Sequence, residues 1–330
     1  MRHGEKTLRH LLRPILPWLD DPAVTELIVN KPHEVGIETR GEWSWHHVAE
    51  YDFERLDAIA LLAGRMTSRE ADREHPLCGS TLPDGQRIQI CRPPATSPGI
   101  IALCIRKPPR STPSLDDPDR LDLFTLTNAR AAKRSRSDDE LLALYRAGDY
   151  RGVLRAGARL RKTIGACGLT GSGKTQTLRS IMQEIPDRHR LVTVESDPEF
   201  GDAGPVNKVS LFYNEEREGQ QAVDVVKASL RMYPSTIAFQ EVRGPESFAL
   251  MRAILSGHNS FTSWHSAEGG EIAAMCLMLR QHPSCTPLPE EQLVALVQSC
   301  FDIIVYCERD GANFNVPRLW LRVAEEEIVQ

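Results

Sequence analysis

The sequence predicts an α/β protein with a mostly parallel sheet in its C-terminal half and a smaller α/β domain before it. From residue 154 onward, short apolar runs alternate with segments of helical spacing, a pattern typical of a parallel sheet with helices on its faces. A complete phosphate-binding loop stands near the start of this half. The length of 330 residues is sufficient for two domains, each with its own core.

The N-terminal domain is predicted to span residues 1–108, where turn residues separate short β-rich runs. These runs are residues 24–29, 34–38, 43–46, 87–92 and 100–106, with a helical segment that begins near residue 53. Residues 109–150 combine prolines with acidic and basic runs, which indicates an interdomain linker whose later part is helical. The basic run at 133–136 fits contact with a polyanion or, more commonly, a solvated linker surface.

The C-terminal domain is predicted to span residues 151–330, and its buried strands are expected at residues 163–167, 191–194, 236–239, 260–264 and 302–306. Residues 168–175 read Gly-Leu-Thr-Gly-Ser-Gly-Lys-Thr and connect the first of these strands to a helical segment. A glycine-rich turn without a ligand is the alternative, but it does not explain the order of strand, loop and helix.

The chemistry of this loop suits a nucleoside triphosphate and its metal. Side chains at Gly171 and Gly173 would block the approach of backbone N–H groups to phosphate. Lys174 would contact the β- and γ-phosphates, and the Thr175 hydroxyl would bind the bridging Mg²⁺. ATP and Mg²⁺ are therefore the predicted cofactors. The predicted nucleotide-binding residues are Gly168, Leu169, Thr170, Gly171, Ser172, Gly173, Lys174, Thr175 and Gln176.

Polar side chains follow three of the predicted strands, at the edge where ligands of parallel sheets gather. Glu241 is the first choice for the carboxylate that orients or deprotonates water, and Glu195 is the second carboxylate near the metal. His265 would sense the γ-phosphate through a hydrogen bond. Each has a purely structural alternative, such as a helix cap or a pair with Arg243. The predicted metal ligands are Thr175, Glu195 and Glu241.

Arginines of the N-terminal domain are candidates for closing over the nucleotide. Charge develops on the γ-phosphoryl oxygens during transfer, and a guanidinium can stabilise it. Arg87, Arg92 and Arg106 lie at a predicted hairpin and strand end, where one or two of them could reach the nucleotide. The alternative is that they are ordinary surface residues.

Composition narrows the classes of partner. The net charge of −5 provides no general attraction to nucleic acid, so no specific nucleic-acid binding is predicted. The eight cysteines are dispersed without a CxxC pair, as expected for reduced cytoplasmic thiols rather than a zinc site.

The N-terminal segment is predicted to be a helix, because Leu8, Leu11, Leu12 and Ile15 recur at helical spacing among basic residues. This helix would cap its own domain or, less commonly, rest on an anionic membrane surface.

Taken together, the motifs resemble the type II and type IV secretion ATPase superfamily, in particular its conjugative DNA-transfer, or type IV secretion, branch. The likeness covers most of the chain. Beside the phosphate-binding loop, it rests on residues 25–30 with 41–43, 82–87, 105–108, 194–195, 230–232, 241–246 and 257–265.

The resemblance implies a RecA-like ATPase domain after the smaller N-terminal domain, with six copies in a ring and nucleotide between the two domains. It implies that Glu241 is catalytic, that Glu195 and His265 assist, and that Arg87 and Arg106 reach the γ-phosphate. The ring would lie in the cytoplasm, peripherally associated with the inner membrane, and would drive substrate transport or pilus assembly through partner proteins of the secretion machinery.

Three departures from the family pattern leave the activity open. Ser196 replaces an aspartate, Gln240 replaces a glycine before Glu241, and Ser235 replaces an aspartate after Pro234. Gln240 adds bulk beside Glu241, so that slow hydrolysis is expected.

Two alternatives to an ATP-driven motor remain. One is a nucleotide-gated scaffold with little hydrolysis. The other, less favoured, is a small-molecule kinase, for which no acceptor site is recognisable.

Overall fold

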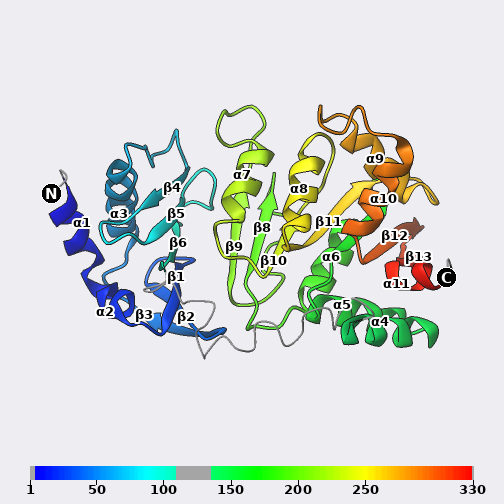
Figure 1. The fold of residues 1–330 in the computed structure, drawn as a ribbon, viewed down its shortest axis with the longest axis horizontal. Helices are drawn as coiled ribbons and strands as arrows, with labels where there is room; N and C mark the ends of the chain where they lie inside the picture. Colours follow the sequence, from blue (N-terminus) through cyan, green and yellow to red (C-terminus); the bar gives the residue numbers. More distant parts are fainter. Residues whose placement is uncertain (1–3, 109–134, 329–330) are drawn as a thin grey trace, which may run out of the picture.

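The computed structural model describes residues 4–108 and 135–328, which form two sheets with their covering helices, arranged side by side (Figure 1). In the N-terminal part, six antiparallel strands follow the order β3-β2-β1-β6-β5-β4. These strands are β1 Val24–Val29, β2 Glu34–Thr39, β3 Glu42–His47, β4 Leu77–Thr81, β5 Arg87–Cys91 and β6 Ala102–Arg106. The helices of this part are α1 Glu5–Leu12, α2 Leu16–Asp20 and α3 Phe53–Met66, with a 3₁₀ turn at Arg13–Ile15.

Helix α1 packs on its own domain. Leu8 and Leu12 are buried in the N-terminal core together with Ile59 and Ala63 of α3. Helix α3 begins after Asp52, whose carboxylate accepts a hydrogen bond from the Arg55 backbone amide at 2.8 Å. The apolar face of α1 is therefore occupied by protein, which is the commoner of the two uses that its sequence allows.

The C-terminal sheet has seven strands in the order β13-β12-β7-β11-β10-β8-β9, and every neighbouring pair is parallel except β12 and β13. The predicted mostly parallel sheet is confirmed. The strands are β7 Ile164–Gly168, β8 Leu191–Glu195, β9 Lys208–Phe212, β10 Thr236–Phe239, β11 Asn259–His265, β12 Ile303–Asp310 and β13 Asn313–Leu321.

Alternation along the strands divides this core into two layers. Ile237 and Phe239 belong to one buried cluster, whereas Ala238 between them belongs to the other. The first cluster is covered by α7 Ala222–Ser229, α8 Glu246–Leu255, α9 Glu271–Leu279 and α10 Glu290–Cys300. The second is covered by α4 Arg136–Arg146, α5 Tyr150–Arg159, α6 Lys174–Met182 and α11 Arg322–Ile328.

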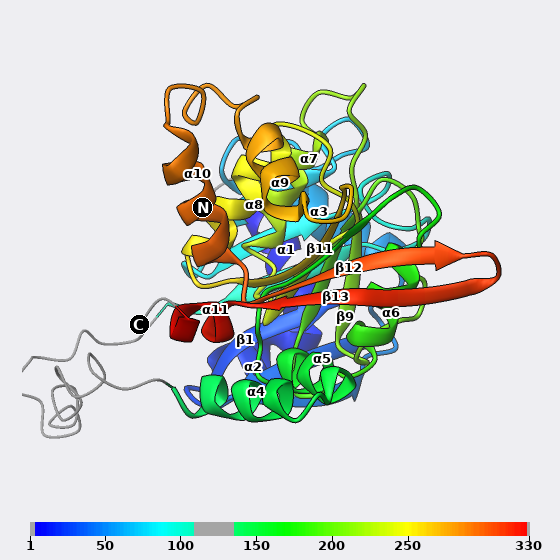
Figure 2. The same ribbon diagram turned by 90° about the vertical axis from the view of Figure 1, so that its right-hand side faces the viewer.

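The sequence analysis does not predict the strands β4, β9 and β13 or the helices α2, α9 and α11. Strand β13 is exposed over most of its length, and Pro317 interrupts the alternation of Phe314 and Val316 with polar residues, so that the sequence does not indicate a buried strand there. It is ordered by pairing with β12, and the two strands project from the body as a long hairpin (Figure 2). Helix α9 is apolar around most of its surface, which hides its helical period.

All eight cysteines are buried free thiols. Burial raises the pKa of the Cys91 thiol to about 12, so that this side chain behaves as a small apolar core residue. Among the helices that the structure describes, none is both long enough and apolar enough to cross a bilayer.

A buried arginine joins the two domains. Arg190 has no exposed surface and donates from Nη1 to Asn30 Oδ1 at 2.8 Å and to Asn207 Oδ1 at 2.6 Å. Its Nε donates to the Met232 carbonyl oxygen at 2.6 Å. Burial lowers the pKa of this guanidinium to about 10. Because Asn30 belongs to the N-terminal domain and the other partners to the C-terminal domain, Arg190 connects them directly.

Replacing Arg190 should destabilise the protein, because three buried hydrogen bonds would be lost and a void would form. We expect Arg190→Ala to lower the free energy of unfolding by roughly 2–4 kcal/mol. Urea denaturation followed by tryptophan fluorescence measures the change. Arg188→Ala, at an exposed position two residues earlier, is the matched control. Equal stability of the two variants would contradict this role.

Candidate active site

A cavity of about 660 Å³ surrounds the phosphate-binding loop at the carboxyl ends of the parallel strands. Residues 170–176 form one wall. The ends of β10 and β11 contribute Glu241 and His265, and the β12–β13 hairpin contributes Arg309 and Phe314. Parallel pairing of β10 and β11 brings Glu241 and His265 to one edge of the sheet, as the sequence predicted.

Glycine is needed in the loop for reasons of backbone geometry as well as space. Gly168 has φ of 146°, and a Cβ there would lie 2.2 Å from the Cys307 carbonyl oxygen of the neighbouring strand β12. Gly173 has φ of 90°, and its Cβ would lie 2.8 Å from the Phe314 ring. The loop can therefore pass closely beneath the hairpin only with glycine at these positions.

Lys174 holds a buried positive charge at the centre of this loop, with 7% of its surface exposed. Its Nζ donates to the carbonyl oxygens of Gly168 at 3.2 Å and Leu169 at 3.1 Å, and lies 3.2 Å from His265 Nδ1. Burial lowers the pKa of the Lys174 ammonium, and the nearby Glu241 carboxylate opposes this effect. Phosphate oxygens would be stronger acceptors for this ammonium than the two neutral carbonyls.

His265 links Lys174 to Glu241 through its two ring nitrogens. Its Nε2 lies 2.8 Å from Glu241 Oε1. If the Lys174 ammonium donates to Nδ1, then Nε2 carries the ring proton and donates to the carboxylate. The second carboxylate oxygen of Glu241 accepts from Arg243 Nε at 2.8 Å. These contacts hold the Glu241 carboxylate in place with both oxygens engaged.

The acidic residue next to Thr175 is Glu199. The Thr175 hydroxyl donates to Glu199 Oε2 at 3.3 Å, and both residues line the cavity. Glu195 lies elsewhere: it is 1% exposed and does not line this cavity. Its carboxylate accepts hydrogen bonds from the Thr193 hydroxyl and, at 2.9 Å, from the Phe200 amide. Glu195 therefore shapes the turn that presents Glu199, and it does not contact Thr175 or Lys174 in this structure.

Gln240 also supports that turn. Its side-chain oxygen accepts hydrogen bonds from the Ser196 amide at 2.8 Å, the Ser196 hydroxyl at 3.2 Å and the Asp197 amide at 3.4 Å. The two departures at positions 196 and 240 are therefore one paired feature. The bulk of Gln240 is directed to the loop after β8, and it ties that loop to the strand that ends in Glu241.

The N-terminal arginines do not line the Lys174 cavity. Arg87 and Arg106 face each other across β5 and β6 and line a different cavity. The Arg106 guanidinium pairs with Glu26 and lies over the Tyr233 ring, 5.2 Å from its centroid. Arg92 forms a salt bridge with Asp57 at 2.5 Å within its own domain. Within this chain, therefore, Arg87, Arg92 and Arg106 are not positioned to contact a nucleotide at Lys174.

Sequence reasoning did not single out Arg179, Arg309 or Phe314, which also line the cavity. Arg179 lies one turn after Thr175 on α6, a position that the helical spacing could have indicated. Arg309 lies over the Phe314 ring at 5.4 Å from its centroid. Nothing local to the hairpin sequence signals that it reaches the phosphate-binding loop.

Comparison with known proteins agrees with this geometry. The family model described as Type II/IV secretion system protein matches residues 146–279. The type IV secretion system protein VirB11 of Brucella suis is 34% identical over an alignment of 319 residues, and the match covers 94% of this chain and 88% of the relative. The chain belongs to the type IV secretion ATPase family.

Further similarities extend over nearly the whole chain. The type IV secretion system protein PtlH of Bordetella pertussis is 36% identical over 322 residues, covering 94% of each chain. The crystal structure of the VirB11 ATPase from the Brucella suis type IV secretion system, in complex with sulphate, matches with a TM-score of 0.90 at 33% identity. The match covers 99% of this chain and 98% of that one. This member of the type IV secretion ATPase family is thus an ATPase with a RecA-like C-terminal domain.

The position of Glu199 beside Thr175 leads to a test with Mg²⁺. We expect Glu199→Gln to raise the Mg²⁺ concentration for half-maximal ATP turnover by about tenfold, because a carboxylate beside the expected Mg²⁺ position would lose its charge. Titration of turnover with Mg²⁺ at saturating ATP measures this. Asp197→Asn, an exposed carboxylate of the same turn, is the control. A larger effect from Glu195→Gln than from Glu199→Gln would favour Glu195 as the metal-binding carboxylate instead.

Proposed function

We propose that this protein hydrolyses Mg²⁺-bound ATP within a homo-hexameric ring and uses the cycle to move one domain against the other. The ring would serve a type IV secretion or conjugative transfer system, where it drives substrate transport or pilus assembly. The observation that carries this proposal is the connected series Lys174, His265 and Glu241 in one cavity with the phosphate-binding loop. The sulphate complex of the Brucella suis VirB11 ATPase is consistent with a fold that accepts tetrahedral anions.

ATP binding would begin at Lys174. Its ammonium would exchange the carbonyl oxygens of Gly168 and Leu169 for the β- and γ-phosphates. His265 Nδ1 would then lose its lysine donor, so that the ring could accept a different partner or turn toward the γ-phosphate. His265 would thereby report to Glu241 whether the triphosphate is present.

The donor set beside Thr175 fits a hard divalent cation, because a hydroxyl and a carboxylate oxygen lie 3.3 Å apart at the loop. We assign Thr175 as its direct ligand and Glu199 as the nearer carboxylate. Bound Mg²⁺ would neutralise charge on the β- and γ-phosphate oxygens. Glu241 would orient the attacking water, since His265 and Arg243 already hold its carboxylate in one position.

Arg87 and Arg106 are proposed to act on the nucleotide of a neighbouring subunit. They line a cavity that shares no residue with the Lys174 cavity of the same chain. A site completed by arginines from another copy would require the ring for full activity and would transmit nucleotide state between subunits.

We also propose that the ring lies in the cytoplasm, peripherally associated with the inner membrane beside other secretion proteins. Membrane contact would use surfaces other than the apolar face of α1, which is buried.

A nucleotide-gated scaffold is the second candidate, because both oxygens of Glu241 are engaged and Gln240 ties its strand to the loop after β8. The two candidates differ in turnover. If the protein is a motor, Lys174→Ala should abolish ATP binding, and Glu241→Gln should keep binding but slow hydrolysis by at least about 10²-fold. Phosphate release and nucleotide-binding assays measure the two effects.

Lys227→Ala, at an exposed lysine of α7, is the control for the Lys174 variant. Wild-type protein that binds ATP but releases phosphate only at the background rate would favour the scaffold. Unchanged turnover in both Lys174→Ala and Glu241→Gln would rule out the proposed site.

The origin of the arginines can be tested by mixing variants. We expect Arg87→Ala to lower turnover by about 10³-fold, as for arginines that contact the transferred phosphoryl group. Co-expression with Lys174→Ala should restore part of the activity, because intact phosphate-binding loops would meet intact arginines on neighbouring subunits. Arg73→Ala, an exposed arginine of the same domain, should remain active. No recovery in the mixed rings would mean that Arg87 does not act between subunits.

A further inference from the structure

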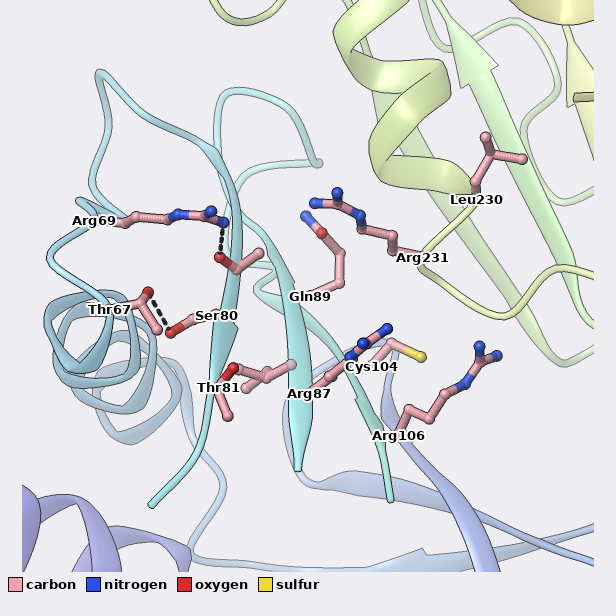
Figure 3. Close-up of a pocket in the computed structure, with 12 residues that line it drawn as sticks. Thr67, Arg69, Ser80, Thr81, Arg87, Gln89, Cys104, Arg106, Leu230 and Arg231 are labelled. Carbon is pink, nitrogen blue, oxygen red and sulfur yellow. Dashed lines mark hydrogen bonds between the residues drawn. The ribbon is translucent and has the colours of Figure 1, made fainter. Parts of the chain in front are cut away.

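The second cavity, where Arg87 and Arg106 lie, has a volume of about 420 Å³ and is formed by both domains (Figure 3). Strands β4, β5 and β6 supply most of its wall, and Leu230 and Arg231, directly after α7, supply the opposite side. The cavity is therefore a space between the two domains.

Its lining is strongly positive. Arg69, Arg87, Arg106 and Arg231 line it, and no aspartate or glutamate is among the lining residues. The Arg106 guanidinium is neutralised by Glu26. Within the described ranges, the guanidinium groups of Arg87 and Arg231 have neither a hydrogen bond nor a salt bridge. Several uncompensated positive charges therefore face one small volume, where they repel each other unless an anion lies between them.

Arg69 and Arg231 converge on the same point of β4 from different domains. A Cβ atom at Gly79 would lie 2.8 Å from Arg231 Nη1 and 3.7 Å from Arg69 Nη1. The Arg69 guanidinium also donates to the Gly79 carbonyl oxygen. Glycine at this strand position leaves the space in which the two guanidinium groups approach each other. Figure 3 shows the Arg231 side chain extending from the C-terminal domain toward Gln89 of β5.

The side-chain oxygen of Gln89 is a buried acceptor without a hydrogen-bond donor among the described residues. Gln89 is 4% exposed and lines the cavity, and its Nε2 donates to the Ile90 carbonyl oxygen at 3.1 Å. Its Oε1 is buried and accepts no hydrogen bond in the structure. That oxygen would lie 3.2 Å from a Cβ at Gly79, beside the two guanidinium groups. An acceptor among cations suits a ligand that has a hydroxyl donor as well as anionic oxygens.

We propose that this interdomain cavity binds a small phosphate-bearing anion of the pyrophosphate class, separate from the nucleotide at Lys174. Guanidinium groups bind phosphate oxygens in a bidentate manner. A monohydrogen phosphate group also has a hydroxyl, which would donate a hydrogen bond to Gln89 Oε1. The anion joins Arg69 of the N-terminal domain to Arg231 of the C-terminal domain.

Such an anion holds the two domains of one chain together. It also engages Arg87, so that, if this arginine acts between subunits as proposed above, a filled cavity withdraws it from the neighbour's nucleotide. Binding itself does not depend on that role and can be measured without ATP turnover.

The test is calorimetric titration of pyrophosphate into the full-length Lys174→Ala variant at low salt, because this variant removes the phosphate-binding loop as a competing site. We expect saturable binding at one site per chain. Adding Arg231→Gln or Gly79→Ala should weaken it by about tenfold or more, since one guanidinium contact is lost or displaced. The Gly79→Ala change keeps every charge and requires the Arg231 side chain, and to a smaller extent the Gln89 side chain, to move. Thermal unfolding of each variant verifies that it is folded.

The matched control is Arg252→Gln on Lys174→Ala, which removes an exposed arginine of α8 outside the cavity and should leave binding unchanged. A parallel titration with ADP distinguishes two sources of the anion. If ADP and pyrophosphate bind with equal affinity, the site accepts the diphosphate group of a nucleotide. If only pyrophosphate binds, the ligand is a free anion. Absence of saturable binding to Lys174→Ala, or equal affinities of the Arg231→Gln and Arg252→Gln variants, would overturn the proposal. Neither result would alter the expected loss of ATP binding in Lys174→Ala.

Discussion

The buried ammonium of Lys174 is the interaction on which the active site depends. It lies at the carboxyl end of β7, where it is held by two carbonyl oxygens of its own loop and by one nitrogen of His265. This contact leaves the other ring nitrogen to meet Glu241, which in turn binds Arg243. A change in the contacts of Lys174 would therefore alter, through His265, the contacts of the Glu241 carboxylate that we assign to catalysis.

The positive charges of the two domains are used in different ways. In the C-terminal domain, Lys174 and Arg243 are each compensated by acceptors within the active site. At the boundary between the domains, Arg190 is buried and bound to neutral acceptors, which makes it a structural connection. The cavity at Arg69 and Arg231 is different, since its guanidinium groups outnumber the available carboxylates. A small anion there and a nucleotide at Lys174 would act on the same domain boundary from separate sites.

Much of the active site could be predicted because its signals are local. The phosphate-binding loop is contiguous, and Glu241 and His265 each follow a buried strand directly, so parallel pairing of β10 and β11 brings them together. Glu195 satisfies the same rule, yet its carboxylate turns to the Phe200 amide and Glu199 meets Thr175 instead. The sequence pattern cannot distinguish the two glutamates, because their directions depend on the conformation of residues 196–200. Phe314 and Arg309 were beyond prediction, since they reach the loop through a hairpin whose strand β13 lacks a buried face.

By itself, the sequence determined the parallel sheet, the phosphate-binding loop and the family, because each depends on residue spacing within short segments. Side chains at residues 237–239 point alternately to the two faces of the sheet, and the glycines of the loop allow its positive φ angles. Both effects depend on backbone geometry within a few residues. Only the tertiary structure decided that Arg87 and Arg106 lie apart from Lys174 and that Arg69 and Arg231 approach each other at Gly79. Those relations depend on how the two sheets and their helices pack against each other. That packing is set by buried contacts, such as those of Arg190, between residues far apart in the chain.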